Sequence, residues 1–346
     1  MGRSSLEDID EETLAHVARL PLTIACWDYD RTRALMDGRV RVEGCDVTTL
    51  ALSPEEAFFR AFRHHEFDVS ELSFSTYMMS RAKGTCPYIA IPAFVSRAFR
   101  HSAIYIRTDR GIRAPADLKG RVVGVPEYQV TAALWVRGML KDEYGVEAGD
   151  LDWRTGGVEE PGRHEKVELS LPANVRVTPV AAGKTLGAML AAGEIDALVA
   201  PRAPSCFVRG APNVGRLFAD SRAAETAYWT KTRIFPIMHV VGVRESLVAA
   251  HPWLPASVFK AFVQAKALAV PDLFEVAALK YTLPWIAAEA ETTRALMGED
   301  FWPYGVEKNQ PTLDAITRYS FEQGLSPRRL AVDELFAPST RERFKV

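Results

Sequence analysis

Arginine side chains flank several apolar runs that are predicted to be strands. The planar guanidinium pairs with a carboxylate through two parallel hydrogen bonds, so arginines at strand ends favour an anion-binding site. For Arg97 and Arg100 the alternative is a pair of surface charges, and for Arg154 it is a solvated loop. Four positions show this placement: Arg97, Arg100, Arg154 and Arg202.

Two histidines are candidates for acid–base chemistry, because imidazole titrates close to neutral pH. His239 lies in the apolar run Phe-Pro-Ile-Met-His-Val-Val, and His101 follows directly after Arg100. A lone histidine in an apolar strand is more often a hydrogen-bonded core residue, and His101 could equally cap the chain beside the two arginines. Both interpretations stay open on the sequence alone.

Polar side chains lie at the ends of two further predicted strands. Asp28 and Tyr29 follow the first strand, while Glu71 and Ser73 end the third. Either carboxylate could accept a proton or bind a hydroxyl group. Helix capping explains Asp28 and Ser73 equally well, because short polar side chains are favoured at that position.

A third kind of anion site is predicted where Glu127 and Tyr128 open a helix after a strand. Backbone amides at a helix N-terminus attract negative charge. This turn could therefore bind a carboxylate even if both side chains point away from it.

Motifs for metals, nucleotides and nucleophiles are not found. The sequence contains no HExxH, paired CxxC, P-loop or GxGxxG pattern. We interpret His64-His65-Glu66 as a solvated helix end, because adjacent side chains on a helix diverge. We therefore predict no organic cofactor and no metal ligands, with a bound divalent metal as the alternative.

The elements that must position these groups alternate between strand and helix from Pro21 onward, which is typical of α/β layers with largely parallel sheets. After about residue 245 the pattern is mostly helical. Ligands bind such sheets at the carboxyl ends of the strands. Two crossovers, near residues 108 and 235, predict two lobes around a cleft that closes on a small molecule. The expected domains are 21–108 with 235–346 (lobe 1), 109–234 (lobe 2) and an N-terminal extension, 1–20.

Charge and hydropathy exclude several classes of partner. Lys and Arg number 42 and Asp and Glu 44, for a net charge of −2, which argues against a nucleic-acid protein that depends on overall positive charge. No apolar run approaches the ~20 residues of a membrane span, so no membrane partner is expected. Residues 1–18 carry five acidic residues and no apolar core of a secretory signal, so we expect a cytoplasmic protein.

Cysteines and tryptophans give weaker indications. The four cysteines have no paired spacing and are interpreted as core thiols. The helical C-terminal part offers apolar surface that either contacts a partner subunit in a homo-oligomer or covers lobe 1. The residues concerned are Trp253, Trp285, Phe301 and Trp302.

Three stretches carry a more specific signal: Trp27-Asp-Tyr-Asp, Ser96-Arg-Ala-Phe-Arg-His and Phe235-Pro-Ile-Met-His. Through them the chain resembles the 4,5-dihydroxyphthalate decarboxylase family over roughly residues 21–330. The element beginning at Asp117 (DLKGRVVG) and the one beginning at Gly193 (GEIDAL) are general to binding proteins. The resemblance implies a type 2 periplasmic-binding-protein-like fold and a carboxy-lyase of aromatic-compound catabolism, in phthalate degradation.

The reaction implied is conversion of 4,5-dihydroxyphthalate, a small aromatic diacid, to protocatechuate and CO2 by acid–base catalysis in the inter-lobe cleft. Cations would hold the spectator carboxylate, a base would take the phenolic proton para to the leaving carboxylate, and an acid would protonate the ring carbon. The catalytic candidates are His239, His101, Glu71 and Asp28. The substrate-binding candidates are Arg97, Arg100, Arg202, Tyr29, Ser73, Glu127, Tyr128 and Arg154.

Two alternatives remain. The first is a non-catalytic solute-binding protein for an aromatic or heterocyclic carboxylate, which would have to be exported and is therefore disfavoured by the missing leader. The second is an enzyme similar to thiamine-pyrimidine synthases, although the Cys- and His-rich iron-binding run that those suggest is not found.

Overall fold

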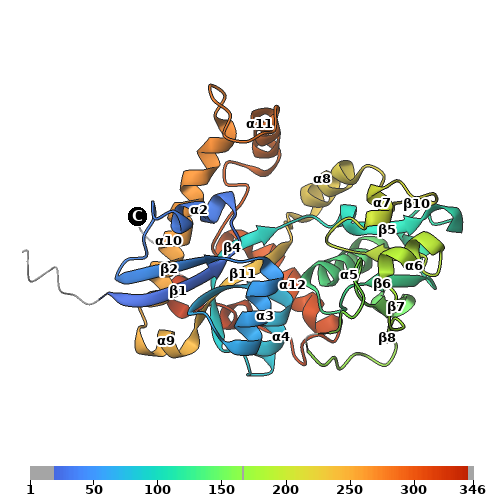
Figure 1. The fold of residues 1–346 in the computed structure, drawn as a ribbon, viewed down its shortest axis with the longest axis horizontal. Helices are drawn as coiled ribbons and strands as arrows, with labels where there is room; N and C mark the ends of the chain where they lie inside the picture. The colour runs from blue at the N-terminus through green and yellow to red at the C-terminus, as the bar shows by residue number, and fades with distance from the viewer. Residues whose placement is uncertain (1–18, 166, 342–346) are drawn as a thin grey trace, which may run out of the picture.

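The structure is a computed structural model that describes residues 19–165 and 167–341. The predicted N-terminal extension lies almost entirely outside these residues. The chain forms two lobes, each built on its own mixed sheet and covered by helices (Figure 1).

The first lobe contains a five-stranded sheet in the order β2-β1-β3-β11-β4. Strand β1 runs parallel to β2 and β3, whereas β11 is antiparallel to both β3 and β4. The carboxyl end of β3 therefore lies beside the beginning of β11. The strands are β1 (Leu20–Cys26), β2 (Cys45–Ala51), β3 (Val69–Ser73), β4 (Tyr88–Arg97) and β11 (Ile237–Arg244).

The second lobe contains a six-stranded sheet in the order β10-β5-β9-β6-β7-β8. Strands β9, β6, β7 and β8 are parallel, and β5 is antiparallel to β9 and β10. The strands are β5 (Ile104–Arg107), β6 (Val122–Val125), β7 (Asp152–Thr155), β8 (Arg176–Pro179), β9 (Ala197–Val199) and β10 (Val214–Arg216).

The two crossovers join β4 to β5 and α8 to β11. The second falls near residue 235, where the sequence predicts it. The first lies before residue 104, so the predicted boundary near residue 108 is wrong by one strand: β5 pairs with β9 in the second sheet. An apolar run predicts a strand but says nothing about which sheet it joins.

Helices of the first lobe come from both ends of the chain. Helix α10 packs on α2 and β4, and α3 packs on β3. The helices are α2 (Asp30–Met36), α3 (Pro54–His64), α4 (Phe74–Ala82), α9 (Glu245–Ala250), α10 (Leu254–Ala269), α11 (Ile286–Met297) and α12 (Gln310–Glu322). Those of the second lobe are α5 (Thr131–Tyr144), α6 (Leu186–Ala192), α7 (Ser205–Val208) and α8 (Ser221–Thr232).

Helix α3 begins with a sequence that is typical of a helix start. The Ser53 hydroxyl accepts a hydrogen bond from the Glu56 amide, and Pro54 occupies the first turn, where its missing N–H costs nothing. Ala57 and Phe58 are buried on the face turned to the sheet. The N-terminal turn of α3 is thereby fixed at the edge of the space between the lobes.

A buried interface ties the lobes together on the side of α5 and α12. The Trp135 indole donates to the carbonyl of Ile237 at 2.8 Å, and the Gln323 amide donates to the carbonyl of Leu134 at 3.0 Å. Arg137 Nε donates to Gln323 Oε1 at 2.6 Å. Helix α12 of the C-terminal part therefore packs on the second lobe as well as on the first.

Gly138 allows this interface to close, so we expect Gly138→Ala to destabilise the protein. A Cβ at this position would lie 2.3 Å from the ring of Tyr319. Overpacking of this kind costs about 1–3 kcal/mol, more than the ~1 kcal/mol that alanine gains over glycine in a helix. Chemical denaturation measures the effect. In a Tyr319→Ala background, which removes the ring, the same substitution should cost nothing, and an equal cost in both backgrounds would contradict the explanation.

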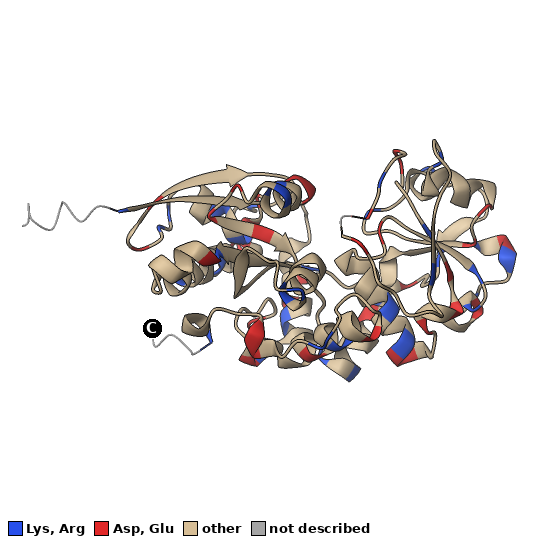
Figure 2. Ribbon diagram, turned by 90° about the horizontal axis from the view of Figure 1, so that it is seen from below, with Lys and Arg blue, Asp and Glu red and all other residues tan. Residues whose placement is uncertain are grey.

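The charge distribution on the surface and the burial of the cysteines agree with what the composition of the chain predicts. Acidic and basic residues are interspersed over both lobes in the view from below (Figure 2). All four cysteines are buried and unpaired, which confirms their interpretation as core thiols. Within residues 19–165 and 167–341, no helix is long and apolar enough to cross a membrane.

Candidate functional site

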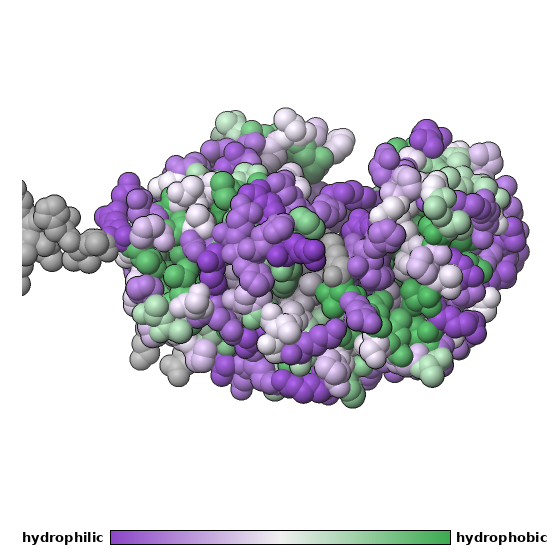
Figure 3. Space-filling model, turned by 60° about the horizontal axis from the view of Figure 1, so that its bottom comes forward, coloured by the Kyte–Doolittle hydropathy of each residue, from purple (hydrophilic) through white to green (hydrophobic). Residues whose placement is uncertain are grey.

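A cavity of about 650 Å³ lies between the two lobes. Its walls in the first lobe come from the N-terminus of α3, the end of β3 and the beginning of β11. In the second lobe they come from the start of α5, from residues 157–163 and from residues 200–203 after β9. The space-filling view shows the surface hollowed between the lobes (Figure 3). We call this cavity the cleft.

A histidine–carboxylate pair lies at the wall of the cleft in the first lobe. His239 Nδ1 is 2.6 Å from Glu71 Oε1. The same oxygen accepts a hydrogen bond from the Tyr29 hydroxyl at 2.8 Å, and Glu71 Oε2 accepts one from the Trp27 amide at 2.8 Å. The pairing follows from the sheet, because His239 on β11 is opposite Ser73 on β3 and Glu71 is two residues away.

This arrangement keeps Glu71 ionised although its side chain is fully buried. Burial alone would raise the pKa of its carboxyl group, but the hydrogen bonds from His239, Trp27 and Tyr29 hold that pKa below its usual value. Burial and the neighbouring Glu71 charge raise the pKa of Tyr29, so its hydroxyl stays a donor.

His239 is thereby oriented for proton transfer. Its Nδ1 is engaged by Glu71, while the side chain is 18% exposed at the cleft wall and its ring packs edge-on against Phe58. Nε2 is the ring nitrogen left to act on a ligand. A buried carboxylate behind an imidazole fixes the tautomer and stabilises the imidazolium, the arrangement used by general acid–base catalysts.

Arg100 supplies positive charge to the same cleft. Its Nε contacts the Met238 sulfur at 3.2 Å, and burial lowers the pKa of its guanidinium to about 10, which leaves it cationic at neutral pH. Among the described residues, no carboxylate forms an ion pair with it. A half-buried guanidinium that faces a cavity without an ionic partner is suited to bind an anionic ligand.

Arg202 lies across the cleft on the second lobe. Its Nη2 is 3.1 Å from Glu55 Oε2 at the beginning of α3, so the ion pair bridges the two lobes. The Arg202 side chain is 80% exposed. An exposed pair of this kind is worth ~0–1 kcal/mol, so a ligand carboxylate can replace Glu55 at little cost.

Ser73 lies in the cleft but does not cap α4 through its hydroxyl. Its Oγ is instead 3.1 Å from Thr131 Oγ1, the first residue of α5 in the other lobe. Thr131 also accepts a hydrogen bond from the Ser75 amide at 3.1 Å. Sequence reasoning missed Thr131, since a threonine at a helix start carries no signal beyond capping.

The turn before α5 does bind a carboxylate, but one from this chain. The backbone amides of Tyr128 and Gln129 both donate to Glu165. The Glu127 side chain is buried and accepts from Arg163 Nε at 2.7 Å. The Tyr128 side chain is buried under the guanidinium of Arg137. Of these groups only Arg163, missed by the sequence analysis, lines the cleft.

Arg97 and His101 lie elsewhere, and we no longer assign them to the site. Arg97 is buried and donates to the carbonyls of Phe235 and Pro303 and to the Asn309 side chain. His101 is buried against the rings of Phe218 and Tyr228, where burial lowers its pKa to about 4. Two residues lie between Arg97 and Arg100, and the strand ends at Arg97, so the two side chains point to different places.

Asp28 and Arg154 are likewise corrected. Asp28 Oδ2 pairs with Arg33 on α2 at 2.5 Å and lies at a different surface from the cleft. Arg154 pairs along its own strand with Asp152 at 2.6 Å. For Asp28 the sequence also allows helix capping, and for Arg154 a solvated loop. In the structure each side chain forms an ion pair with a residue close to it in the chain.

The described part of the chain contains no preformed metal-binding cluster. No group of three or more His, Cys, Asp or Glu side chains there is arranged to hold an ion. Cys26 is next to Glu71, but burial and that charge raise its thiol pKa well above the usual value, which disfavours a thiolate nucleophile.

Comparison with known proteins gives the family. No protein-family model matches the chain. A 4,5-dihydroxyphthalate decarboxylase of Comamonas testosteroni is 49% identical over 330 residues, which cover 95% of this chain and 100% of that protein. The chain belongs to the 4,5-dihydroxyphthalate decarboxylase family. A second member, from Pseudomonas putida, is 52% identical over 211 residues, covering 61% of this chain and 82% of its own length.

Solved structures give the fold of this decarboxylase family member. The periplasmic aliphatic sulphonate binding protein SsuA of Escherichia coli superimposes with a TM-score of 0.51 at 11% identity, covering 94% of this chain and 99% of that one. The predicted periplasmic-binding-protein-like fold and the predicted family are therefore confirmed. At this identity the likeness concerns the fold alone.

Proposed function

We propose that the protein is a carboxy-lyase that converts 4,5-dihydroxyphthalate to protocatechuate and CO2 in the cleft. The single observation that carries the proposal is that His239, which is hydrogen-bonded to the buried Glu71, lines the same cavity as Arg100, which has no ion-pair partner among the described residues. The family supports it, since both relatives compared are named 4,5-dihydroxyphthalate decarboxylase.

In the proposed reaction, the substrate loses to solvent the phenolic proton para to the leaving carboxylate. Electron density then reaches the ring carbon that bears this carboxylate, and the imidazolium of His239 protonates that carbon. The C–C bond breaks, its electron pair returns to the ring, and the phenolate regains a proton to give protocatechuate. Glu71 positions His239 and stabilises its charged form without touching the substrate.

The second carboxylate of the substrate needs a cation that does not become neutral. Arg100 meets that need, because it stays charged and has no ion-pair partner in the described chain. Arg202 is the second candidate, after exchange of Glu55 for the ligand. The proposed reaction uses no organic cofactor, and a requirement for a divalent metal is left to the assay.

The direct test incubates the purified full chain with 4,5-dihydroxyphthalate and follows CO2 release and protocatechuate formation, with EDTA in one arm and added Mg²⁺ or Mn²⁺ in another. Turnover supports the proposal. If no arm turns over, across a panel of dihydroxy aromatic acids, the proposal fails. Tight binding of the diacid without turnover would instead favour the solute-binding alternative.

We expect Glu55→Gln to lower KM about two- to fivefold with kcat unchanged. The substitution removes a carboxylate that competes with the substrate for Arg202, and exposed pairs of this kind are worth ~0.2–1 kcal/mol. Steady-state kinetics measures the change. Glu56→Gln is the matched control, since Glu56 pairs with Arg60 on its own helix and should leave KM as it is. A higher KM for Glu55→Gln would contradict the assigned exchange.

Homo-oligomer formation and a cytoplasmic location stay predictions. Trp285 is 73% exposed and Trp253 43%, so each leaves apolar surface that a partner could cover. Trp302 instead packs within lobe 1, where its indole donates to the carbonyl of Phe94 at 2.9 Å. Light scattering of the purified chain tests the first prediction.

A further inference from the structure

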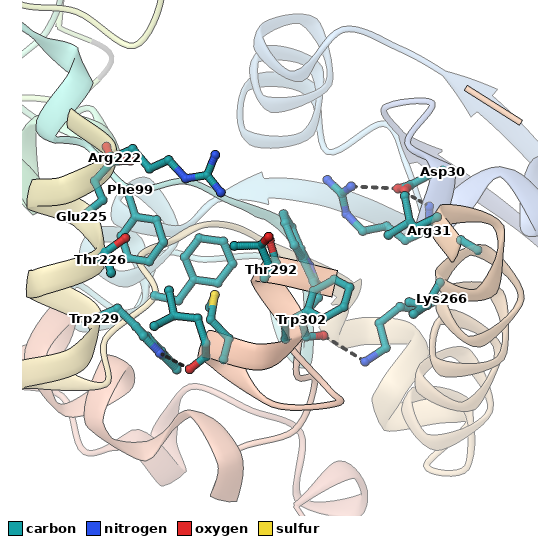
Figure 4. Close-up of a pocket in the computed structure, with 18 residues that line it drawn as sticks. Asp30, Arg31, Phe99, Arg222, Glu225, Thr226, Trp229, Lys266, Thr292 and Trp302 are labelled. Carbon is teal, nitrogen blue, oxygen red and sulfur yellow. Dashed lines mark hydrogen bonds and ion pairs between the residues drawn. The ribbon is translucent and has the colours of Figure 1, made fainter. Parts of the chain in front are cut away.

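A second cavity, of about 520 Å³, lies beside the two crossovers, and none of the described residues lines both it and the cleft. Phe99 from the first crossover and Phe235 from the second both line it, whereas Arg100 and Met238 line the cleft. The other walls are α8 of lobe 2 and the α10–α11 region of lobe 1. We call this cavity the hinge pocket (Figure 4).

One wall of the hinge pocket is aromatic and rigidly held. The Phe99 and Phe235 rings are stacked with centroids 4.8 Å apart, and Trp302 packs edge-on against Phe235 at 5.4 Å. The Trp302 indole is fixed by its hydrogen bond to the carbonyl of Phe94. Such a wall suits a flat aromatic ring, which gains from both contact area and ring geometry.

Two guanidinium groups from different lobes complete the pocket. Figure 4 shows Arg31 and Arg222 reaching into it from opposite sides. Arg31 is sandwiched between the rings of Tyr29 and Trp302, its guanidinium carbon 4.1 and 4.2 Å from their centroids. Its Nε donates to the carbonyl of Val95 at 2.7 Å and its Nη1 to Asp30 at 2.9 Å.

The second guanidinium, that of Arg222 on α8, is held by an exchangeable partner. It pairs with Glu289 on α11 at 2.9 Å, and both side chains are substantially exposed, so the pair is weak. The remaining charged side chains at the pocket are already engaged. Lys266 pairs with Asp300 at 2.7 Å, and Glu225 accepts from the Ser102 amide at 3.4 Å.

We propose that the hinge pocket is a second binding site, specific for an aromatic monocarboxylate, that contacts both lobes and both crossovers. The ring would lie against the Phe99–Phe235–Trp302 wall, and the carboxylate would replace Glu289 on Arg222. A diacid fits less well, because Asp30 and Glu225 already place negative charge in the pocket.

A ligand in this pocket would act on the cleft through two routes. It would brace α8 against the α10–α11 region and so oppose relative motion of the lobes about the crossovers. It would also contact Arg31, which stacks on Tyr29, whose hydroxyl donates to Glu71 beside His239. This consequence rests on the proposed function, whereas the binding site itself does not.

The test is isothermal titration of the full chain with 4-hydroxybenzoate, combined with quenching of tryptophan fluorescence, since Trp229 and Trp302 line the pocket. Wild-type protein should bind at the hinge pocket, and Arg100→Gln should keep this binding because Arg100 lies in the cleft. Arg222→Gln should weaken it about tenfold, and Glu289→Gln should tighten it, because it frees Arg222. Arg209→Gln, an exposed arginine of lobe 2 outside both cavities, is the matched control.

Thr226→Trp fills the pocket from α8 and should abolish binding while leaving the mass in solution unchanged. Equal affinity in the Arg222→Gln and Glu289→Gln variants would overturn the proposal. A lower mass by light scattering for Thr226→Trp would also overturn it, since a second copy of the chain would then occupy the pocket. If the wild-type protein binds 4-hydroxybenzoate in the hinge pocket but does not turn over 4,5-dihydroxyphthalate, the result contradicts the proposed function and not the hinge pocket.

Discussion

Replacing His239 with glutamine should lower kcat by about 10²–10⁴-fold while leaving substrate affinity within a few-fold. Glutamine keeps a polar group at the cleft wall but cannot carry a proton between solvent and substrate, and positioned general acid–base groups contribute rate factors of this size. His239 has this role because Glu71 engages its Nδ1 and leaves Nε2 for the ligand. Decarboxylation kinetics at saturating 4,5-dihydroxyphthalate measures the loss.

Glu71 should show a different signature, because it acts through His239. Glu71→Gln exchanges a buried anion for a neutral amide, which removes the charge that stabilises the imidazolium. We expect kcat to fall about 10²-fold and the basic limb of its pH profile, where the imidazolium loses the proton that the ring carbon needs, to move to lower pH, with KM little changed. A purely structural role would lower the amount of folded protein without moving the pH profile.

His101→Gln is the matched control for both substitutions. His101 is buried among aromatic rings outside the cleft, so its replacement should alter stability and leave the pH profile of kcat in place. Retention of kcat within threefold by His239→Gln would refute the assignment of His239. An equal loss of kcat in the folded His101→Gln protein would refute the distinction between the two histidines.

The fold could be predicted further than the site because periodicity reports burial. The alternation of strand and helix from Pro21 onward predicts the α/β layers that the structure shows, and Ser53-Pro-Glu-Glu is typical of a helix start such as that of α3. Sheet membership of β5 could not be predicted, because strand pairing is set by contacts between distant residues and not by the apolar run itself.

The residues of the candidate site could likewise be predicted only in part. Glu71 and His239 could be named because each lies two residues from the end of a strand at the cleft edge, where side-chain chemistry and position coincide. Asp28, Arg97 and Arg154 could not be excluded, because a partner one to five residues away, or a distant carbonyl, decides where a long side chain points. Thr131 was missed since its role depends on a contact with Ser73 in the other lobe.

Substituting Arg100 should give the largest effect on substrate recognition. Arg100→Gln removes the cation that we assign to the spectator carboxylate, and a hydrogen bond to a charged group contributes ~1.5–3 kcal/mol, so kcat/KM for the diacid should fall about 10–150-fold. Arg100→Lys keeps the charge but loses the planar fork, so its loss should be intermediate. Steady-state kinetics with 4,5-dihydroxyphthalate compares the three proteins.

A second ligand separates recognition of that carboxylate from general damage to the cleft. A dihydroxybenzene without any carboxylate (catechol) cannot use Arg100 as proposed, so its binding should change little in Arg100→Gln, while that of the diacid weakens strongly. Arg154→Gln, which loses only the pair with Asp152, should affect neither ligand. Equal weakening of both ligands in Arg100→Gln would mean that Arg100 shapes the cleft, because only a direct ion pair makes the loss depend on the second carboxylate.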